Sequence, residues 1–321
     1  MFTIRDSVEK SPLLMREVYC DKLIELALEN EDIVVLDADL VSSSGMKPFF
    51  SRFPDRAIQC GIAEANMIGI AAGLSAAGKI PFAHSFGCFA TRRACDQIMV
   101  SAAYAKQNVR IVGSDPGITA AYNGGTHMPF EDMGVLRSIP GITLIEPADT
   151  VMLAEILAQL AILQGVYYLR MARKNTAAVY CEGSSFEIGR GNVLLEGKDV
   201  TIIASGIMVY EAFKAAAILR AEKLSAKVVD MFTWKPIDTE LVERCARTTG
   251  ALVTAENHNI IGGLGSAVAE AAARTHPAPI EMVGVKDRFG QVGTEDFLRE
   301  EYNLTATDIV EAAKRAIARK T

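Results

Sequence analysis

The sequence predicts an α/β protein built from two doubly wound domains. Two observations predict this class: short apolar strands alternate with helical segments along the chain, and 321 residues are enough for about two domains of ordinary size. Strands that alternate with helices pair in parallel and are covered by helices on both faces. Half of the residues are hydrophobic and 22% are charged, a composition typical of a globular chain with a large core.

Residues 1–178 are predicted to form the first domain. Each expected strand is a short, mainly apolar run, which is typical of a strand buried on both faces. These runs lie at residues 33–36, 57–62, 80–82, 109–113, 142–145 and 166–170. The expected helices cover residues 12–30, 64–77, 93–105 and 149–163, and the pair Ser11 and Pro12 is expected to cap the first of them.

A polar stretch that bears Gly and Ser follows, and residues 179–191 are predicted to be a linker. The alternation then resumes in a second domain over residues 192–321. Its strands are expected at residues 200–204, 227–230, 252–256 and 280–283, and its helices at 209–223, 239–247, 265–274 and 305–318.

Charge and composition exclude several classes of partner. The net charge of −6 argues against nucleic acid, which would need a basic face. No apolar run approaches the roughly 18 residues of a membrane span, and the first residues lack the hydrophobic segment of a signal peptide. The six cysteines form no C-x-x-C pair, which indicates thiols in a reducing compartment. The sequence therefore predicts a cytoplasmic protein with no membrane partner.

Three segments that follow predicted strands carry candidate functional residues. His127, either structural or catalytic, lies in a long glycine-rich loop at the carboxyl end of a strand, where parallel sheets bind ligands. Glu64 begins an Ala/Gly-rich helix and is either an acid facing the helix dipole or a buried carboxylate available for proton transfer. Phe86 and Phe89 are either core residues or a flat surface for a heteroaromatic ring.

Familiar cofactor and metal motifs are absent from the sequence. Residues 262–266 open a helix, but Val268 stands where the dinucleotide fingerprint needs its third glycine, and no Gly-Lys-Ser/Thr occurs there. His258 and His276 have no neighbours at metal-ligand spacing, so no metal site is predicted. The G-x-S-x-G elbow of serine hydrolases is also missing.

Ten short motifs nevertheless occur in one order along the chain. They are DADL (37–40), GIAEANM (61–67), SFGCF (85–89), ACDQI (94–98), GGTH (124–127), ED (131–132), EPAD (146–149), RMAR (170–173), ENHNIIGGLGS (256–266) and DRFG (287–290). The ordered set resembles the C-terminal half of a transketolase, in which a pyrimidine-binding domain precedes the C-terminal domain of the family. The resemblance covers the whole chain.

This resemblance implies a thiamine-diphosphate enzyme that transfers a two-carbon ketol unit between sugar phosphates, with the cofactor supplying the carbanion chemistry. Glu64 matches the acid that hydrogen-bonds the aminopyrimidine ring and promotes its imino tautomer. Phe86 and Phe89 match the aromatic residues that cover the pyrimidine. Asp39 and Leu40 match positions near the cofactor.

The resemblance also implies a substrate site. His127 matches a histidine that hydrogen-bonds the hydroxyls of the donor near the reacting carbon. Arg16, Ser43 and Arg173 fall where the family binds the phosphate of the substrate, and the arginine fork suits phosphate oxygens.

The substrate loop departs from the family at three positions. Sugar-phosphate transketolases usually carry His, an acid and Asp where this chain has Asp115, Tyr122 and Asn123. An aspartate in place of the histidine near a phosphate is repulsive. We therefore expect a specialised substrate at Asp115 and Asn123, such as a branched sugar phosphate.

The family motif G-D-G, which holds magnesium and the diphosphate, does not occur in this sequence. The resemblance therefore implies a partner, an N-terminal transketolase subunit that carries this motif, in an α2β2 assembly with the thiamine diphosphate shared between the subunits. The Ala/Gly-rich helix after Glu64 is the expected packing surface, because small side chains allow close approach.

Two other kinds of thiamine-diphosphate enzyme remain as alternatives. The β-subunit of a 2-oxo acid dehydrogenase has a similar length and architecture, and 1-deoxyxylulose-5-phosphate synthase carries both halves on one chain. The motifs GGTH, EPAD and Arg-x-x-Arg favour a transketolase. A non-catalytic partner subunit is a further alternative, and the presence of Glu64, Phe89 and His127 speaks against it.

Overall fold

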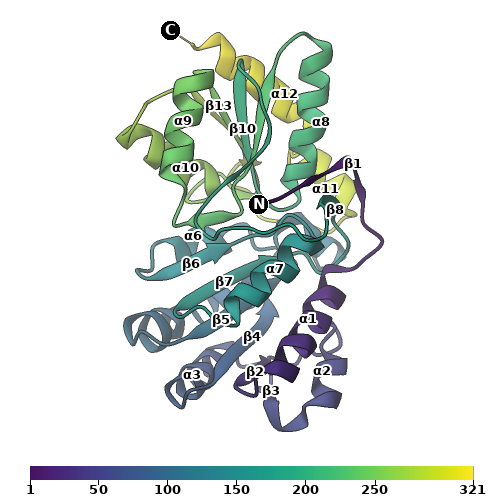
Figure 1. The fold of residues 1–321 in the computed structure, drawn as a ribbon, viewed down its shortest axis with the longest axis vertical. Coiled ribbons are helices and arrows are strands. Elements are labelled where there is room, and N and C mark those ends of the chain that lie inside the picture. Colours follow the sequence, from purple (N-terminus) through teal and green to yellow (C-terminus); the bar gives the residue numbers. More distant parts are fainter. Residues whose placement is uncertain (321) are drawn as a thin grey trace.

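A seven-stranded sheet forms the centre of the first half of the chain in the computed structural model, which describes residues 1–320 (Figure 1). Its strand order is β12-β6-β7-β5-β4-β2-β3. The six strands of the first half pair in parallel, whereas β12 pairs antiparallel with β6. The strands are β2 (Ile33–Asp37), β3 (Ala57–Gln59), β4 (Ile80–Phe86), β5 (Val109–Ser114), β6 (Ile142–Ile145), β7 (Val166–Met171) and β12 (Thr233–Lys235).

Helices cover both faces of this sheet because its strands are apolar on both sides. In β2, Ile33 and Val35 pack with α1 (Met15–Glu29) and α7 (Thr150–Leu160). Val34 and Leu36 point to the other face and pack with α3 (Glu64–Ala76). This alternation follows from the two-residue period of a strand. Shorter helical segments complete the layers: α2 (Lys47–Arg52), α4 (Gly87–Arg92), α5 (Cys95–Gln97), the π-helical Ile98–Tyr104 and α6 (Asp132–Arg137).

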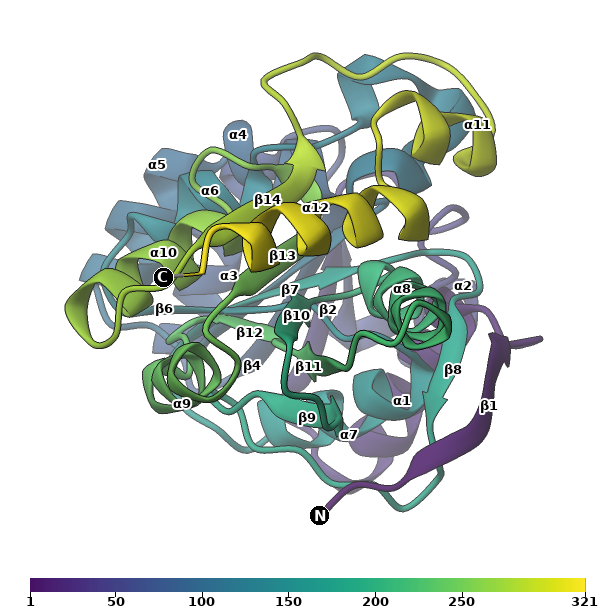
Figure 2. The same ribbon diagram turned by 90° about the horizontal axis from the view of Figure 1, so that it is seen from above.

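The second half of the chain forms a five-stranded sheet of order β14-β13-β10-β11-β9 (Figure 1). These strands are β9 (Asn192–Leu195), β10 (Val200–Ala204), β11 (Ala226–Asp230), β13 (Leu252–Asn259) and β14 (Ile280–Val285), and only the β9–β11 pair is antiparallel. Figure 2 shows α8 (Met208–Ala221) and α12 (Ala306–Ala318) on one face and α9 (Thr239–Thr249) and α10 (Leu264–Arg274) on the other. A short helix, α11 (Glu295–Glu301), lies beyond β14.

The structure confirms the predicted α/β class with parallel sheets, and it corrects three local predictions. The first helix begins at Met15, because the backbone N–H of Ser11 donates to Thr176 O (2.7 Å) and Ser11 therefore does not cap it. The strand predicted at residues 57–62 ends at Gln59, and Gly61 adopts a left-handed φ of 70°. The helix predicted at residues 93–105 is divided into α5 and the π-helical segment, and the separate helix α4 ends before it at Arg92.

Two further strand pairings complete the fold. β1 (Ile4–Lys10) pairs antiparallel with β8 (Ala177–Tyr180) in a separate two-stranded sheet. β12 comes from the second half of the sequence and yet extends the first sheet. The division into domains at residues 178 and 192 stays a prediction.

Among residues 1–320, no helix combines the length and the apolar character that crossing a membrane requires.

Candidate active site

Most of the predicted site residues lie at one edge of the seven-stranded sheet, where the parallel strands end. Phe86 ends β4, Asp115 follows β5, and Arg173 lies two residues after β7. Glu64 begins α3 beside the same edge. The carboxyl ends of parallel strands are the usual ligand-binding edge of a doubly wound sheet.

Glu64 is buried, with 1% of its surface exposed, and two side chains hold its carboxylate. Arg93 Nη1 donates to Oε2 at 2.7 Å, and Ser85 Oγ donates to Oε1 at 3.3 Å. The first turn of a helix also favours a negative charge. The short contact fixes one oxygen of Glu64, while the other has only a long contact and is available to a ligand.

Arg93 is a site residue that the sequence prediction missed. Its guanidinium carbon lies 4.3 Å from the ring centroid of Phe89, so it contacts both Glu64 and an aromatic residue of the site. No sequence motif marks it, because an arginine on a short helical segment is usually a solvated surface residue.

Three rings meet next to this carboxylate. The centroid of His127 lies 5.1 Å from that of Phe89 and 5.9 Å from that of Phe86, and the two phenylalanine rings are 6.3 Å apart. The Nδ1 atom of His127 is 2.9 Å from the hydroxyl of Thr126. Two apolar rings and an adjacent carboxylate oxygen fit a planar heteroaromatic group that also forms hydrogen bonds.

Four further predicted residues form a charged cluster beside the rings. Arg173 lies 5.4 Å from the centroid of Phe86, and its Nε donates to Asp115 Oδ1 at 3.1 Å. Arg16 Nη1 donates to the backbone oxygen of Ser43 at 3.4 Å, and the backbone N–H of Arg16 donates to Arg173 O at 3.2 Å. Arg173 thus uses Nε within the protein, while its two terminal nitrogens donate no hydrogen bond within residues 1–320 and could reach an anion.

Asp115 is the most unusual member of this cluster. Its side chain is buried, its φ is 57°, and its Oδ2 has no hydrogen-bond partner within the described residues 1–320. Burial raises the pKa of this carboxyl, although the positive charges of Arg173, Lys174 and Arg16 oppose the shift. A buried, half-satisfied carboxylate is costly and marks a candidate functional position.

The structure does not join Asp39, Leu40 and Asn123 to this cluster through side-chain hydrogen bonds in the part of the chain it describes. Asp39 has a left-handed φ of 64°, and its N–H donates to Gln59 Oε1 at 2.7 Å. The N–H of Leu40 donates to Asp37 Oδ1. Asn123 is exposed on the loop next to Tyr122, whose side chain is also exposed.

A buried ion network contacts the glycine-rich loop, residues 114–129. Arg170 donates from Nε to Asp132 Oδ2 (2.9 Å) and from Nη1 to Glu146 Oε1 (2.5 Å). Its Nη2 also donates to Pro129 O at 3.3 Å. Burial disfavours the charged form of Arg170, but the negative charges of Asp132 and Glu146 raise the pKa of Arg170 above its usual value. Residues of the ED, EPAD and RMAR motifs therefore support the loop that carries His127.

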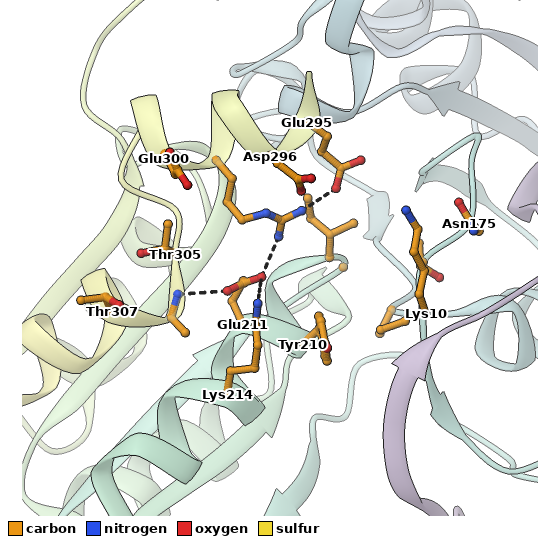
Figure 3. A pocket seen from close by; sticks show the side chains of 17 residues that line it. Lys10, Asn175, Tyr210, Glu211, Lys214, Glu295, Asp296, Glu300, Thr305 and Thr307 are labelled. Atoms are coloured by element: carbon orange, nitrogen blue, oxygen red, sulfur yellow. Dashed lines mark hydrogen bonds and ion pairs between the residues drawn. The ribbon is translucent and has the colours of Figure 1, made fainter. Parts of the chain in front are cut away.

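A cavity of about 510 Å³ lies between β1, α8, α11 and the start of α12 (Figure 3). Its charged groups are largely paired: Glu211 accepts hydrogen bonds from Arg299 Nη1 (2.9 Å) and from the N–H of Ala306 (3.0 Å), and Lys214 lies 2.6 Å away. It shares no lining residue with the cluster around Glu64. Within residues 1–320, no group of three or more His, Cys, Asp or Glu side chains could hold a metal ion.

Comparison with known proteins identifies the family. Residues 11–178 match the model of the transketolase pyrimidine-binding domain, and residues 189–309 match that of the transketolase C-terminal domain. The chain is 50% identical to the 6-deoxy-6-sulfo-D-fructose transketolase subunit SqwH of Clostridium sp. (strain MSTE9), over 95% of each chain. It is 35% identical to a subunit of the apulose-4-phosphate transketolase of Phocaeicola vulgatus, over 93% of this chain and 96% of that one.

A solved structure gives the same result. The chain resembles a split-gene transketolase, described as an inactive β4 tetramer, with a TM-score of 0.90 and 46% identity over 96% of this chain and 100% of that one. The chain therefore belongs to the transketolase family and carries the pyrimidine-binding and C-terminal domains of that family.

Proposed function

We propose that this chain is the C-terminal subunit of a two-subunit, thiamine-diphosphate-dependent transketolase that transfers a two-carbon ketol unit from a ketose phosphate, or a related ketose, to an aldose phosphate. The observation that carries the proposal is the arrangement of Glu64, Phe86, Phe89 and His127 at one sheet edge. The relatives named as transketolase subunits match this chain over nearly their full length, which supports its assignment to such a subunit.

In this proposal the residues of this chain hold the pyrimidine end of the cofactor. Phe86 and Phe89 pack against the ring, and Glu64 hydrogen-bonds a ring nitrogen through the oxygen that Arg93 leaves free. When bound, thiamine diphosphate supplies a thiazolium that stabilises a carbanion. Glu64 then holds or releases a proton at the ring nitrogen, and His127 hydrogen-bonds a hydroxyl of the donor sugar.

The remaining half of the site is assigned to a partner. We propose that an N-terminal subunit with a G-D-G motif binds the diphosphate and Mg²⁺, and that the two subunits assemble as α2β2. The exposed face of α3 supports a docking surface, because Gly69 and Gly73 are exposed and a methyl group at either would contact nothing within 4 Å. All six cysteines are free thiols, which supports a cytoplasmic location.

The charged cluster supports a specialised ketose as substrate. The anion-binding part consists of Arg16, Ser43 and Arg173. The negatively charged carboxylate of Asp115 lies beside the guanidinium of Arg173. Two relatives are named for unusual sugars, a 6-deoxy-6-sulfofructose and apulose 4-phosphate. We propose that this chain likewise acts on a sulfonated or branched sugar rather than on the common pentose phosphates.

The test is two-carbon transfer by the subunit reconstituted with its N-terminal partner. Glu64→Gln is expected to reduce kcat by about 10²- to 10⁴-fold, because the amide cannot exchange a proton at the ring nitrogen. Glu295→Gln, at the first turn of α11, is the matched control and is expected to leave kcat unchanged. Full activity of the Glu64→Gln pair would instead favour a non-catalytic role for this chain.

A further inference from the structure

The glycine-rich loop is hydrogen-bonded to the second sheet through the side chain of Asn257, near the end of β13. Asn257 Oδ1 accepts from the N–H of Ile118 at 2.9 Å, and Nδ2 donates to Pro116 O at 2.9 Å. A backbone N–H can only donate and a carbonyl can only accept, so these partners determine the orientation of the amide. Asn257 is fully buried, and 139 positions separate it from Ile118.

The packing around these hydrogen bonds leaves no room for adjustment. Gly117 has a φ of 49°, and a Cβ at this position would lie 2.2 Å from Asn257 Oδ1, so only glycine fits. The carbonyl of Asn257 accepts from Arg170 Nη2 at 2.9 Å. Asn257 is therefore attached both to the loop and to the buried ion network of the first sheet.

A second contact from the same half of the chain holds the far end of the loop. Figure 2 shows the segment between β14 and α11 looping outward above helical ribbon of the first half of the chain. A Cβ on Gly125 would lie 2.2 Å from Gly290 O, so the two backbones are in direct contact. Tyr302 supports this contact, since its ring centroid lies 5.2 Å from that of Phe130 and its hydroxyl donates to Phe289 O at 2.8 Å.

We infer that the second half of the chain acts as a clamp that sets the conformation of the loop 114–129, and that Asn257 is its positioning residue. The proposed substrate-binding residues Asp115, Asn123 and His127 all lie in this loop. The clamp therefore determines the positions of their side chains. Its effect on catalysis rests on the proposed function, whereas its effect on the loop does not. Asn257 reaches the loop through Pro116 and Ile118 and acts on the substrate only through them.

Hydrogen exchange of the full-length chain, followed by mass spectrometry, tests the clamp directly. Asn257→Ala removes two hydrogen bonds of ordinary strength, so amides of the loop are expected to exchange at least about tenfold faster. Exchange in β10 and β11 is expected to stay unchanged. The matched control is Thr254→Val, a buried residue of the same strand whose hydroxyl has no hydrogen-bond partner within residues 1–320. Unchanged exchange of the loop in the Asn257→Ala chain would overturn the inference.

A second variant covers the case in which Asn257→Ala fails to fold. Asn257→Asp has the same shape and keeps an acceptor for Ile118, but it loses the donor to Pro116 O. Above pH 7, where the carboxylate is ionised, one of its oxygens faces Pro116 O in place of a donor, so the loop is expected to exchange faster than in the native chain. A loop that stays as protected as in the native chain would contradict the clamp.

In the reconstituted pair, the Asp variant is expected to raise the KM of the donor about tenfold and to leave the affinity for thiamine diphosphate unchanged. A parallel loss of both affinities would indicate a general structural defect and overturn the positioning role. If the native pair transfers no two-carbon unit, the proposed function fails, and loop exchange still decides on the clamp.

Discussion

Asp115 and Arg173 place opposite charges side by side where the substrate anion is proposed to bind. The contact of 3.1 Å between Arg173 Nε and Asp115 Oδ1 orients the guanidinium, while the carboxylate reduces the net positive charge seen by an anion. The carboxylate weakens the binding of a doubly charged phosphate more than it weakens the binding of a singly charged sulfonate. Asp115 is thus expected to shape the choice of substrate.

Replacing Asp115 by Asn tests this expectation. Asn tolerates the left-handed conformation of this position and removes the negative charge. The KM of a phosphorylated ketose is expected to fall about fivefold to tenfold in the reconstituted pair, which corresponds to about 1–1.4 kcal/mol. The exposed Asp55→Asn serves as the control. An unchanged or higher KM in the Asp115→Asn pair would show that the carboxylate does not act through its charge.

Individual site residues were predictable from sequence only where a motif marked them. The structure brings Glu64 and His127 close to the same phenylalanine rings, and each stands in a short motif in the segment that follows a strand. Arg93 stands in none of these motifs, and its partner Glu64 is 29 positions away. Asn257 stands in the motif of residues 256–266, but its role was not predictable because its partner Ile118 is 139 positions away.

At the scale of elements, α3 combines a buried catalytic candidate with an exposed face of small residues. Gly69 and Gly73 are exposed on consecutive turns, and a glycine inside a helix costs about 0.5–1 kcal/mol relative to alanine. Among residues 1–320, no atom outside the helix's own backbone lies within 4 Å of a Cβ added at either glycine. We therefore expect the helix to keep these glycines because a partner subunit approaches closely.

Gly69→Glu tests this surface. The isolated subunit is expected to remain folded, with a free energy of unfolding equal to the native value or higher by up to about 1 kcal/mol, as urea titration would show. Association with the N-terminal subunit is expected to weaken by at least about tenfold in sedimentation experiments, since the new side chain occupies the contact surface. Ala217→Glu, exposed on α8, is the matched control. Native-like association of the Gly69→Glu chain would place the partner elsewhere.

Long strands were predictable as apolar runs, but elements defined by distant partners were not. β12 has three residues, too few to show a period, and it belongs to the first sheet only because it pairs with β6. Likewise, Ser11 matches a helix cap locally, yet its N–H bonds to Thr176 beside β8. Tertiary hydrogen bonds override local propensity at both places.

At the scale of the whole molecule, buried carboxyl groups make stability depend on pH. Burial raises the pKa of Asp230 to about 8, and the charges of Asp149 and Glu146 add to this, while the hydrogen bond from Tyr180, at 2.7 Å, opposes it. Between the unfolded value of about 4 and the folded value of about 8, the folded state binds more protons than the unfolded state. Stability therefore falls as the pH rises through this window.

Asp230→Asn is expected to flatten this dependence. The free energy of unfolding of the native chain should decline between pH 5 and 8, and the variant should reduce the slope by up to about 1.4 kcal/mol per pH unit. Urea unfolding at several pH values measures it, with the exposed Asp6→Asn as control. The slope should not vanish, since burial raises the pKa of Glu256 to about 8 as well. An identical slope in the native and Asp230→Asn chains would contradict this account.

The central proposal is that this chain supplies the pyrimidine half of a cofactor site and a partner supplies the diphosphate half. Titration calorimetry with thiamine diphosphate and Mg²⁺ tests it most directly, applied to this chain, to the N-terminal subunit and to their equimolar mixture. We predict no measurable binding to this chain alone and saturable binding of one cofactor per subunit pair in the mixture, weakened by Glu64→Gln. Tight, Mg²⁺-dependent binding to this chain alone would contradict the proposal.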